Sequence, residues 1–196
     1  MSNNFQRVFF HEVGHFVAKE LNFKLNGIGE AESIELESIG YNNEYLGRTK
    51  PKIPAGVDPN RSIVHLAEKL ASLVYGCFIQ SLFLNQNFTI CFDMKGNGIE
   101  DLKEWDGILL NFSNKRSEII KNEEKYFEKL ISLKENGHFD SFFGLNPDDY
   151  VIKDINNLSL YHLNLNAVRA NIDEFLEIHQ QYYYEFLNEI KNILEI

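Results

Sequence analysis

The chain is poor in cysteine, in basic residues and in long hydrophobic stretches. Its 196 residues include two cysteines and four prolines, and 19 Lys and Arg stand against 29 Asp and Glu, a formal net charge of -10. Such a charge repels the phosphates of nucleic acids and of anionic lipids, so we expect neither as a partner. The longest hydrophobic stretch, Leu73 to Leu84, contains Gln80 and Ser81 and is shorter than the roughly 20 residues that cross a bilayer.

The two cysteines, Cys77 and Cys91, each have hydrophobic neighbours. Buried free thiols of this kind are typical of a reducing compartment, so we expect neither a disulfide nor a thiolate ligand. The first residues contain no basic segment followed by an apolar run and a small-residue cleavage site, which is the pattern of a secretory signal. We therefore expect a cytoplasmic protein.

One short segment, residues 11–15, indicates a chemistry: it reads His-Glu-Val-Gly-His. Residues four apart on a helix project from the same side, so both imidazoles face one point. Two imidazoles supply half of a tetrahedral zinc shell, and one more protein ligand and a water complete a catalytic site. Glu12 is placed to take a proton from a zinc-bound water whose pKa the metal lowers to about 7. The sequence therefore predicts Zn²⁺ bound by His11 and His15, with Glu12 as the base.

The neighbours of the motif favour a helix that begins after Asn3 or Asn4 and ends at Asn22. The alternative is a helix whose two histidines merely face the core or the solvent. Because a buried helix must still satisfy its histidine nitrogens, and a metal does so, we prefer the metal site. The hydrophobic residues that recur at helical intervals are Phe9, Phe10, Val13, Phe16, Val17 and Leu21.

The third ligand has to come from elsewhere, because Leu21 occupies the position at which an extended motif carries a third histidine. The third ligand is then expected to be an acidic residue. Glu68, in the apolar segment that follows, is one candidate, and Asp101, after a glycine-containing loop, is the other. His65 is expected to be an ordinary surface or core histidine.

The remaining patterns predict a mainly α protein with a small β-sheet, an α+β class. We expect residues 1–112 to form a core and residues 113–196 to form a helical extension packed on it as one domain. Expected strands cover Ile34 to Ser38 and Tyr41 to Thr49, and the prolines of residues 51–59 mark a connection or a lid before a cap at Asn60 or Ser62. Expected helices cover Ile63 to Leu84, unbroken or interrupted near Gly76, Glu100 to Phe112, Lys115 to Glu135 as a solvated helix, and Ala167 to Ile196.

Three segments, in this order, resemble the peptidase domain of FtsH-type AAA proteases: His11–His15, Leu70–Gly76 and Glu100–Lys103. In that family the two histidines and the aspartate before Leu-Lys bind zinc. The resemblance therefore implies Asp101 as the third ligand, Glu12 as the base and a zincin-like fold. Family members also end in a long helix.

The resemblance covers roughly the first 110 residues and has clear departures. Gln80 and Ser81 stand in place of paired glutamates, and Trp105 and Asp106 replace Ala-Thr. The chain contains no GxxxxGK[ST] phosphate loop, so it lacks the ATPase that unfolds substrates for FtsH-type proteins. We expect a free-standing, ATP-independent relative.

These observations together predict a zinc-dependent endopeptidase acting on peptides or unfolded proteins, as a homo-oligomer or beside a separate ATPase. One alternative is an ImmA/IrrE-like regulatory peptidase, in which Glu68 is the third ligand. The other is a catalytically degenerate domain that binds partners through its C-terminal helix. The histidines and the glutamate of the motif are all present, which weighs against degeneration.

Overall fold

The computed structural model describes residues 3–27, 29–39, 44–52 and 62–195. Helices predominate in these ranges and the strands form one small sheet, which confirms the predicted α+β class. The α-helices are α1 (Asn3–Asn26), α2 (Ile63–Leu84), α3 (Ile99–Leu109), α4 (Arg116–Glu135), α5 (Asp140–Phe143) and α6 (Leu165–Glu195). The strands are β1 (Ala31–Ile39), β2 (Glu44–Pro51), β3 (Val151–Lys153) and β4 (Leu160–Leu163), and 3-10 turns lie at η1 (Phe88–Ile90), η2 (Leu110–Phe112) and η3 (Pro147–Asp149).

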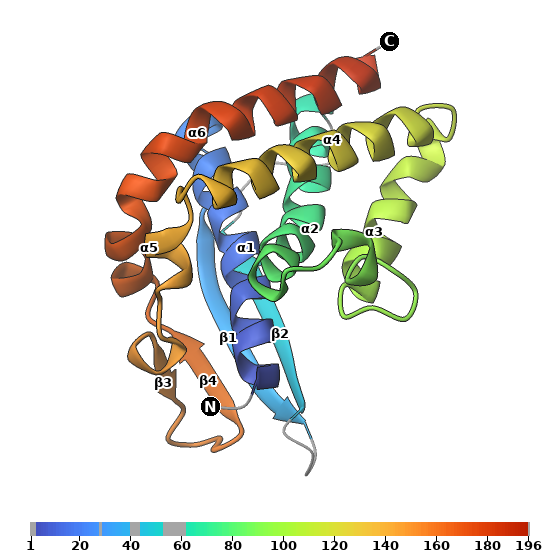
Figure 1. Cartoon of the computed structure of the whole chain (residues 1–196). Coiled ribbons are helices and arrows are strands. Elements are labelled where there is room, and N and C mark those ends of the chain that lie inside the picture. Colours follow the sequence, from blue (N-terminus) through green and yellow to red (C-terminus); the bar gives the residue numbers. More distant parts are fainter. Residues whose placement is uncertain (1–2, 28, 40–43, 53–61, 196) are drawn as a thin grey trace.

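The sheet is antiparallel, with the strand order β2-β1-β4-β3. Strand β2 therefore lies at an edge, and α1 runs along β1 and β2 (Figure 1). The second predicted strand is confirmed from Glu44 onward and extends to Pro51, and residues 41–43 lie outside the described ranges. Strands β3 and β4 fall in a stretch for which the sequence predicts no regular structure. Strand β4 pairs with β1, where Glu35 lies opposite His162, and β3 pairs with β4.

Helix α1 is one turn longer than the sequence predicts. The polar residue Asn22 reads as a stop signal, but the helix continues to Asn26 and ends at Gly27, whose φ is 69°. Asn22 is buried, and its Oδ1 accepts a hydrogen bond from the hydroxyl of Tyr183 at 2.7 Å. A tertiary hydrogen bond thus satisfies a side chain that would otherwise favour a helix end.

Helix α2 is the central buried helix, and it runs unbroken through Gly76. Ser62 caps it, since its Oγ accepts from the backbone N–H of His65 at 3.2 Å, whereas Asn60 lies outside the described residues. The glycine at position 76 permits close packing on α1. A Cβ there would lie 2.5 Å from Nε2 of His15, and one at Gly14 would lie 2.7 Å from the carbonyl oxygen of Tyr75.

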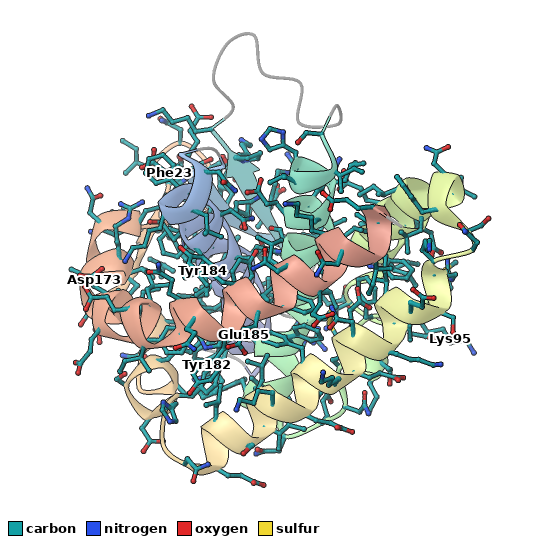
Figure 2. All side chains as sticks on the ribbon, turned by 90° about the horizontal axis from the view of Figure 1, so that it is seen from above. Phe23, Lys95, Asp173, Tyr182, Tyr184 and Glu185 are labelled. Atoms are coloured by element: carbon teal, nitrogen blue, oxygen red, sulfur yellow. A yellow bond between two sulfur atoms is a disulfide. The ribbon has the colours of Figure 1, made fainter. Side chains whose placement is uncertain are left out.

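Helix α6 crosses the molecule beside α4 and covers α2 (Figures 1 and 2). It begins at Leu165, two residues before the predicted start, and Ile196 lies outside the described residues. Tyr182 faces α4, where Nζ of Lys129 lies 4.9 Å from the centre of its ring (Figure 2). One side of this helix is buried in the core, and its residues recur at helical intervals: Ile172, Phe175, Leu176, His179, Tyr183, Phe186, Leu187, Ile190 and Leu194.

The helix predicted as solvated, α4, buries one of its faces. It begins at Arg116 and contributes Ile119 and Leu130 to the core, and it also buries Glu123. One hydrophobic cluster includes residues from both expected segments, 1–112 and 113–196. Each helix in the described ranges is too short or too polar to cross a bilayer.

Candidate metal centre

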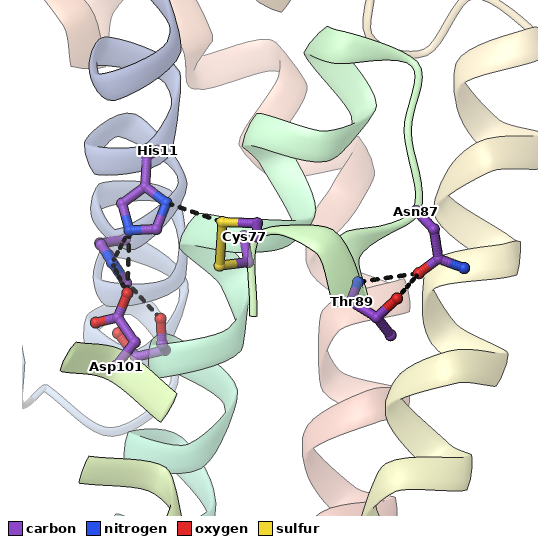
Figure 3. The surroundings of a disulfide bond; sticks show 8 residues. His11, Cys77, Asn87, Thr89 and Asp101 are labelled. Atoms are coloured by element: carbon purple, nitrogen blue, oxygen red, sulfur yellow. Dashed lines mark hydrogen bonds and ion pairs between the residues drawn. A yellow bond between two sulfur atoms is a disulfide. The ribbon is translucent and has the colours of Figure 1, made fainter. Parts of the chain in front are cut away.

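His11 and His15 lie one turn apart on α1 and are both buried against α2. Nδ1 of His15 donates to the carbonyl oxygen of Ser72 at 2.7 Å, and Nδ1 of His11 points to Sγ of Cys91 at 3.8 Å (Figure 3). A carbonyl can only accept, so Nδ1 of His15 carries the proton. In the neutral imidazole, Nε2 of His15 is then left with a free lone pair for a metal.

Asp101 completes a triangle of donor atoms with the two histidines (Figure 3). Its Oδ2 lies 3.0 Å from Nε2 of His11 and 3.3 Å from Nε2 of His15, and the two nitrogens are 3.1 Å apart. Tetrahedral zinc with bonds of about 2.0–2.1 Å needs donors roughly 3.3 Å apart. The donor types and their spacing therefore fit zinc. Asp101 lies in the first turn of α3, as the sequence predicts.

The electrostatics of the triangle indicate a site that attracts a cation. Burial lowers the pKa of His15, but the adjacent Asp101 carboxylate outweighs it and raises that pKa to about 9. Burial likewise raises the pKa of Asp101, and the His15 imidazolium and the hydrogen bonds from both histidines reverse this, holding it well below its usual range. The cluster of donors therefore favours a positive charge at this point, which a bound metal ion would supply.

Glu12 lies beside the triangle and against strand β2. The hydroxyl of Thr49 donates to Oε2 of Glu12 at 2.7 Å, and a Cβ at Gly47 would lie 2.2 Å from Oε1. The ligand atoms of Glu12 and the two histidines lie within 4.8 Å of one another. The side chain is therefore held close to the point where the imidazoles converge. The sequence alone does not indicate that Gly47 and Thr49 contact Glu12, because the residue pattern of this segment predicts only a strand.

Glu68, the alternative third ligand, has other partners. Its carboxylate accepts a hydrogen bond from Nδ2 of Asn26, at the C-terminal end of α1, and burial raises its pKa. Asn22 donates to its backbone oxygen at 3.5 Å. The structure thus brings Asp101, and not Glu68, into contact with the histidines. His65 bonds to Oγ of Ser62 at 3.0 Å, as suits an ordinary histidine.

The expectation of free thiols is wrong, because Cys77 and Cys91 form a disulfide (Figure 3). Hydrophobic neighbours in the sequence indicate burial, but they do not reveal that the chain after η1 folds back onto α2. The Cα atoms of the two cysteines are 5.5 Å apart. The bridge ties the loop before α3 to α2, next to His11. Both sulfurs lie near His11, but as a disulfide they are not thiolate ligands.

A cavity of about 770 Å³ opens over the triangle, between α1, β2, α2 and the start of α3. Its volume falls in the range of sites that hold small ligands or short peptides. Residues 45–49 of the edge strand β2 form one wall. The residues that line it include Arg7, His11, Glu12, Lys19, Asn97 and Asp101.

Compared with protein-family models, curated proteins and solved structures, the chain matches none of them. The similarity to FtsH-type peptidase domains therefore stays a prediction that depends on three sequence segments.

Proposed function

We propose that this protein is a zinc peptidase that hydrolyses peptide bonds in unstructured segments without ATP. One observation carries the proposal: His11 Nε2, His15 Nε2 and Asp101 Oδ2 converge within 3.0–3.3 Å of one another at the floor of a cavity. Three such donors leave one tetrahedral position open, which is the mark of catalytic rather than structural zinc.

Side chains of the protein supply the base and orient the ligands. When bound, zinc supplies a Lewis acid that lowers the pKa of a coordinated water to about 7. Glu12 Oε1 takes the proton of the attacking water and passes it to the leaving amine, while Thr49 holds Oε2. Ser72 fixes the ring of His15, and with it the direction of Nε2.

The substrate binds in extended form beside β2. This strand is at the sheet edge and lines the cavity, so its outer backbone groups can pair with an added strand. Gly47 lies against Glu12, and it carries no side chain that would displace the base. A folded protein does not present such a strand, which limits the substrates to peptides, tails and exposed loops.

The variant Glu12→Gln tests the proposal, since it keeps the size of the side chain and removes its basicity. We expect zinc-loaded wild type to cleave an unstructured protein such as casein, and Glu12→Gln to retain zinc while the rate falls by roughly 10²–10⁴-fold. Glu32→Gln, an exposed carboxylate on β1, is the matched control and should leave the rate unchanged. Wild-type protein that is fully loaded and as inert as Glu12→Gln towards casein and a broad peptide library would contradict the proposal.

A further inference from the structure

Arg7 stands on the same line of α1 as the metal-binding histidines. The positions 7, 11 and 15 are four residues apart, so their side chains leave the same side of the helix. The backbone positions of Arg7 and His11 are one turn, about 6 Å, apart. Both residues line the cavity that contains the triangle. Arg7 is therefore within reach of a substrate whose scissile bond lies at the histidines.

The guanidinium of Arg7 is held by amides. Nη2 donates to Oδ1 of Asn4. With the amide oxygen of Asn97 turned towards Arg7, that oxygen accepts from Nε at 2.8 Å and from Nη1 at 3.2 Å. Of the five N–H groups of the guanidinium, one on Nη1 and one on Nη2 are then left over. One N–H on each Nη atom is what an arginine uses to hold both oxygens of a carboxylate in a bidentate contact.

No carboxylate pairs with Arg7 in the part of the chain that the structure describes. Other cationic side chains of the molecule do have carboxylate partners or neighbours. Arg169 donates to both carboxylate oxygens of Glu20, at 2.7 and 2.8 Å, and Lys69 pairs with Glu104 at 2.6 Å. The ammonium of Lys19, elsewhere in the cavity, lies in the field of several carboxylates. In a chain with a net charge of -10, Arg7 is thus an oriented cation whose charge none of its described neighbours neutralises.

We propose that Arg7 binds a carboxylate of the peptide substrate, one helical turn from the metal ligands. The inference rests on the proposed function and names its substrate class: peptides that carry a C-terminal carboxylate or an acidic side chain close to the scissile bond. Asn4 and Asn97 hold the guanidinium in place without cancelling its charge, which keeps the bidentate face ready for the incoming anion.

Binding can be measured apart from hydrolysis on zinc-loaded Glu12→Gln protein, by fluorescence anisotropy of labelled peptides. Three peptides share one sequence: the first has a free C-terminus and a central Glu, the second an amidated C-terminus, and the third Gln in place of Glu. Arg7→Gln should weaken binding of the peptide that supplies the carboxylate by about 10–100-fold. The peptide that lacks this carboxylate should bind Glu12→Gln protein equally well with and without the Arg7→Gln substitution. The second and third peptides identify which carboxylate is recognised.

Asn97→Asp gives an independent check, because it places a carboxylate against Arg7 and leaves the arginine itself in the chain. Asn97 is exposed, so folding should not suffer. We expect the same loss of affinity as with Arg7→Gln. Arg7→Lys should recover only part of the affinity, since an ammonium lacks the bidentate face. Lys24→Gln, which removes a charge from the same helix outside the cavity, should change nothing.

The outcomes separate this inference from the proposed function. If each of the three peptides binds with the same affinity whether or not Arg7→Gln or Asn97→Asp is present, the role of Arg7 is overturned. The peptidase proposal is then left intact. Loss of affinity with Lys24→Gln as large as with Arg7→Gln also overturns it, because general charge would then be the cause. Absence of both peptide binding and hydrolysis by zinc-loaded protein overturns the peptidase itself.

Discussion

Oδ2 of Asp101 lies 3.0 Å from Nε2 of His11, although the two residues are 90 positions apart in the sequence. The contact depends on the loop after α2, which returns along α1 and brings the first turn of α3 to the histidines. Glu68, much closer to the histidines in sequence, instead accepts a hydrogen bond from Asn26. The fold of this loop therefore brings Asp101, and not Glu68, to the two histidines.

The first prediction concerns zinc affinity. Asp101→Ala should weaken zinc binding by at least the 10–100-fold that losses in the surroundings of a metal typically cost, because it removes a donor atom itself. Glu68→Gln should change the affinity less than about threefold, since its partner is Asn26. Competition with a chelating dye measures both constants. The reverse order of effects would favour Glu68 as the ligand and the ImmA/IrrE-like alternative.

The second prediction concerns the close approach of α1 and α2. In Gly76→Ala the new Cβ would lie 2.5 Å from Nε2 of His15 and 3.0 Å from Cε1 of His11. Both rings must shift, so we expect a loss of about 1–3 kcal/mol in the free energy of unfolding, together with weaker zinc binding. Denaturant titration with and without zinc measures the two effects.

Gly107→Ala is the matched control for this substitution. Gly107 is also a helical glycine, on α3, and a Cβ there would have no neighbour within 4 Å. Alanine should stabilise the exposed helix by about 0.5–1 kcal/mol and leave the zinc affinity unchanged. Stability that falls equally in both variants would contradict the role given to the contact at Gly76.

The helices that define the architecture could be predicted from the sequence because their periodicity is strong. For α2 and α6 the predicted bounds agree with the structure to within two residues. Strands β3 and β4 could not be predicted, since each has only three or four residues and requires pairing with β1 or with the other. A run this short shows no period of its own.

The proximity of His11, Glu12 and His15 could be predicted, because a helix fixes their relative positions locally. Which acidic residue joins the two histidines could not be decided by spacing alone. It depends on tight contacts in the loop before α3, where a Cβ at Gly96 would lie 2.0 Å from the carbonyl oxygen of Cys91. At Gly98 it would lie 2.4 Å from Sγ of Cys77. Such long-range contacts leave no local pattern in a single sequence.

The third prediction concerns the disulfide. The bridge spans 14 residues, so its loss should lower the free energy of unfolding by about 3 kcal/mol. Since the bridge ties the loop before α3, the double variant Cys77→Ser, Cys91→Ser should also bind zinc more weakly than wild type. Thiol alkylation followed by mass spectrometry reports the state of the cysteines, and a dye competition reports zinc. Equal stability of the oxidised protein and the double variant would count against a structural bridge.

The fourth prediction concerns Glu123, a buried carboxylate on α4 that accepts a hydrogen bond from the indole N–H of Trp105 at 2.8 Å. Burial raises the pKa of Glu123 to about 8, despite this hydrogen bond and the nearby Arg116. The unfolded chain loses the proton near pH 4.5, so between that pH and about 8 the folded state binds more protons. This carboxyl's contribution to stability is therefore fully present below pH 4.5 and is lost as the pH rises towards 8.

Glu123→Gln removes this dependence while its amide oxygen can still accept from Trp105. We expect the variant to match wild type near pH 4.5 and to exceed its free energy of unfolding by on the order of 3 kcal/mol at pH 7. Urea titrations across this pH range measure the difference. Glu128→Gln is the matched control, because Glu128 is exposed on the same helix and is not among the charges that shift the pKa of Glu123, so its substitution should leave the pH profile unchanged. A constant difference between Glu123→Gln and wild type at every pH would show that Glu123 does not retain its proton, since only a shifted titration makes the gap grow with pH.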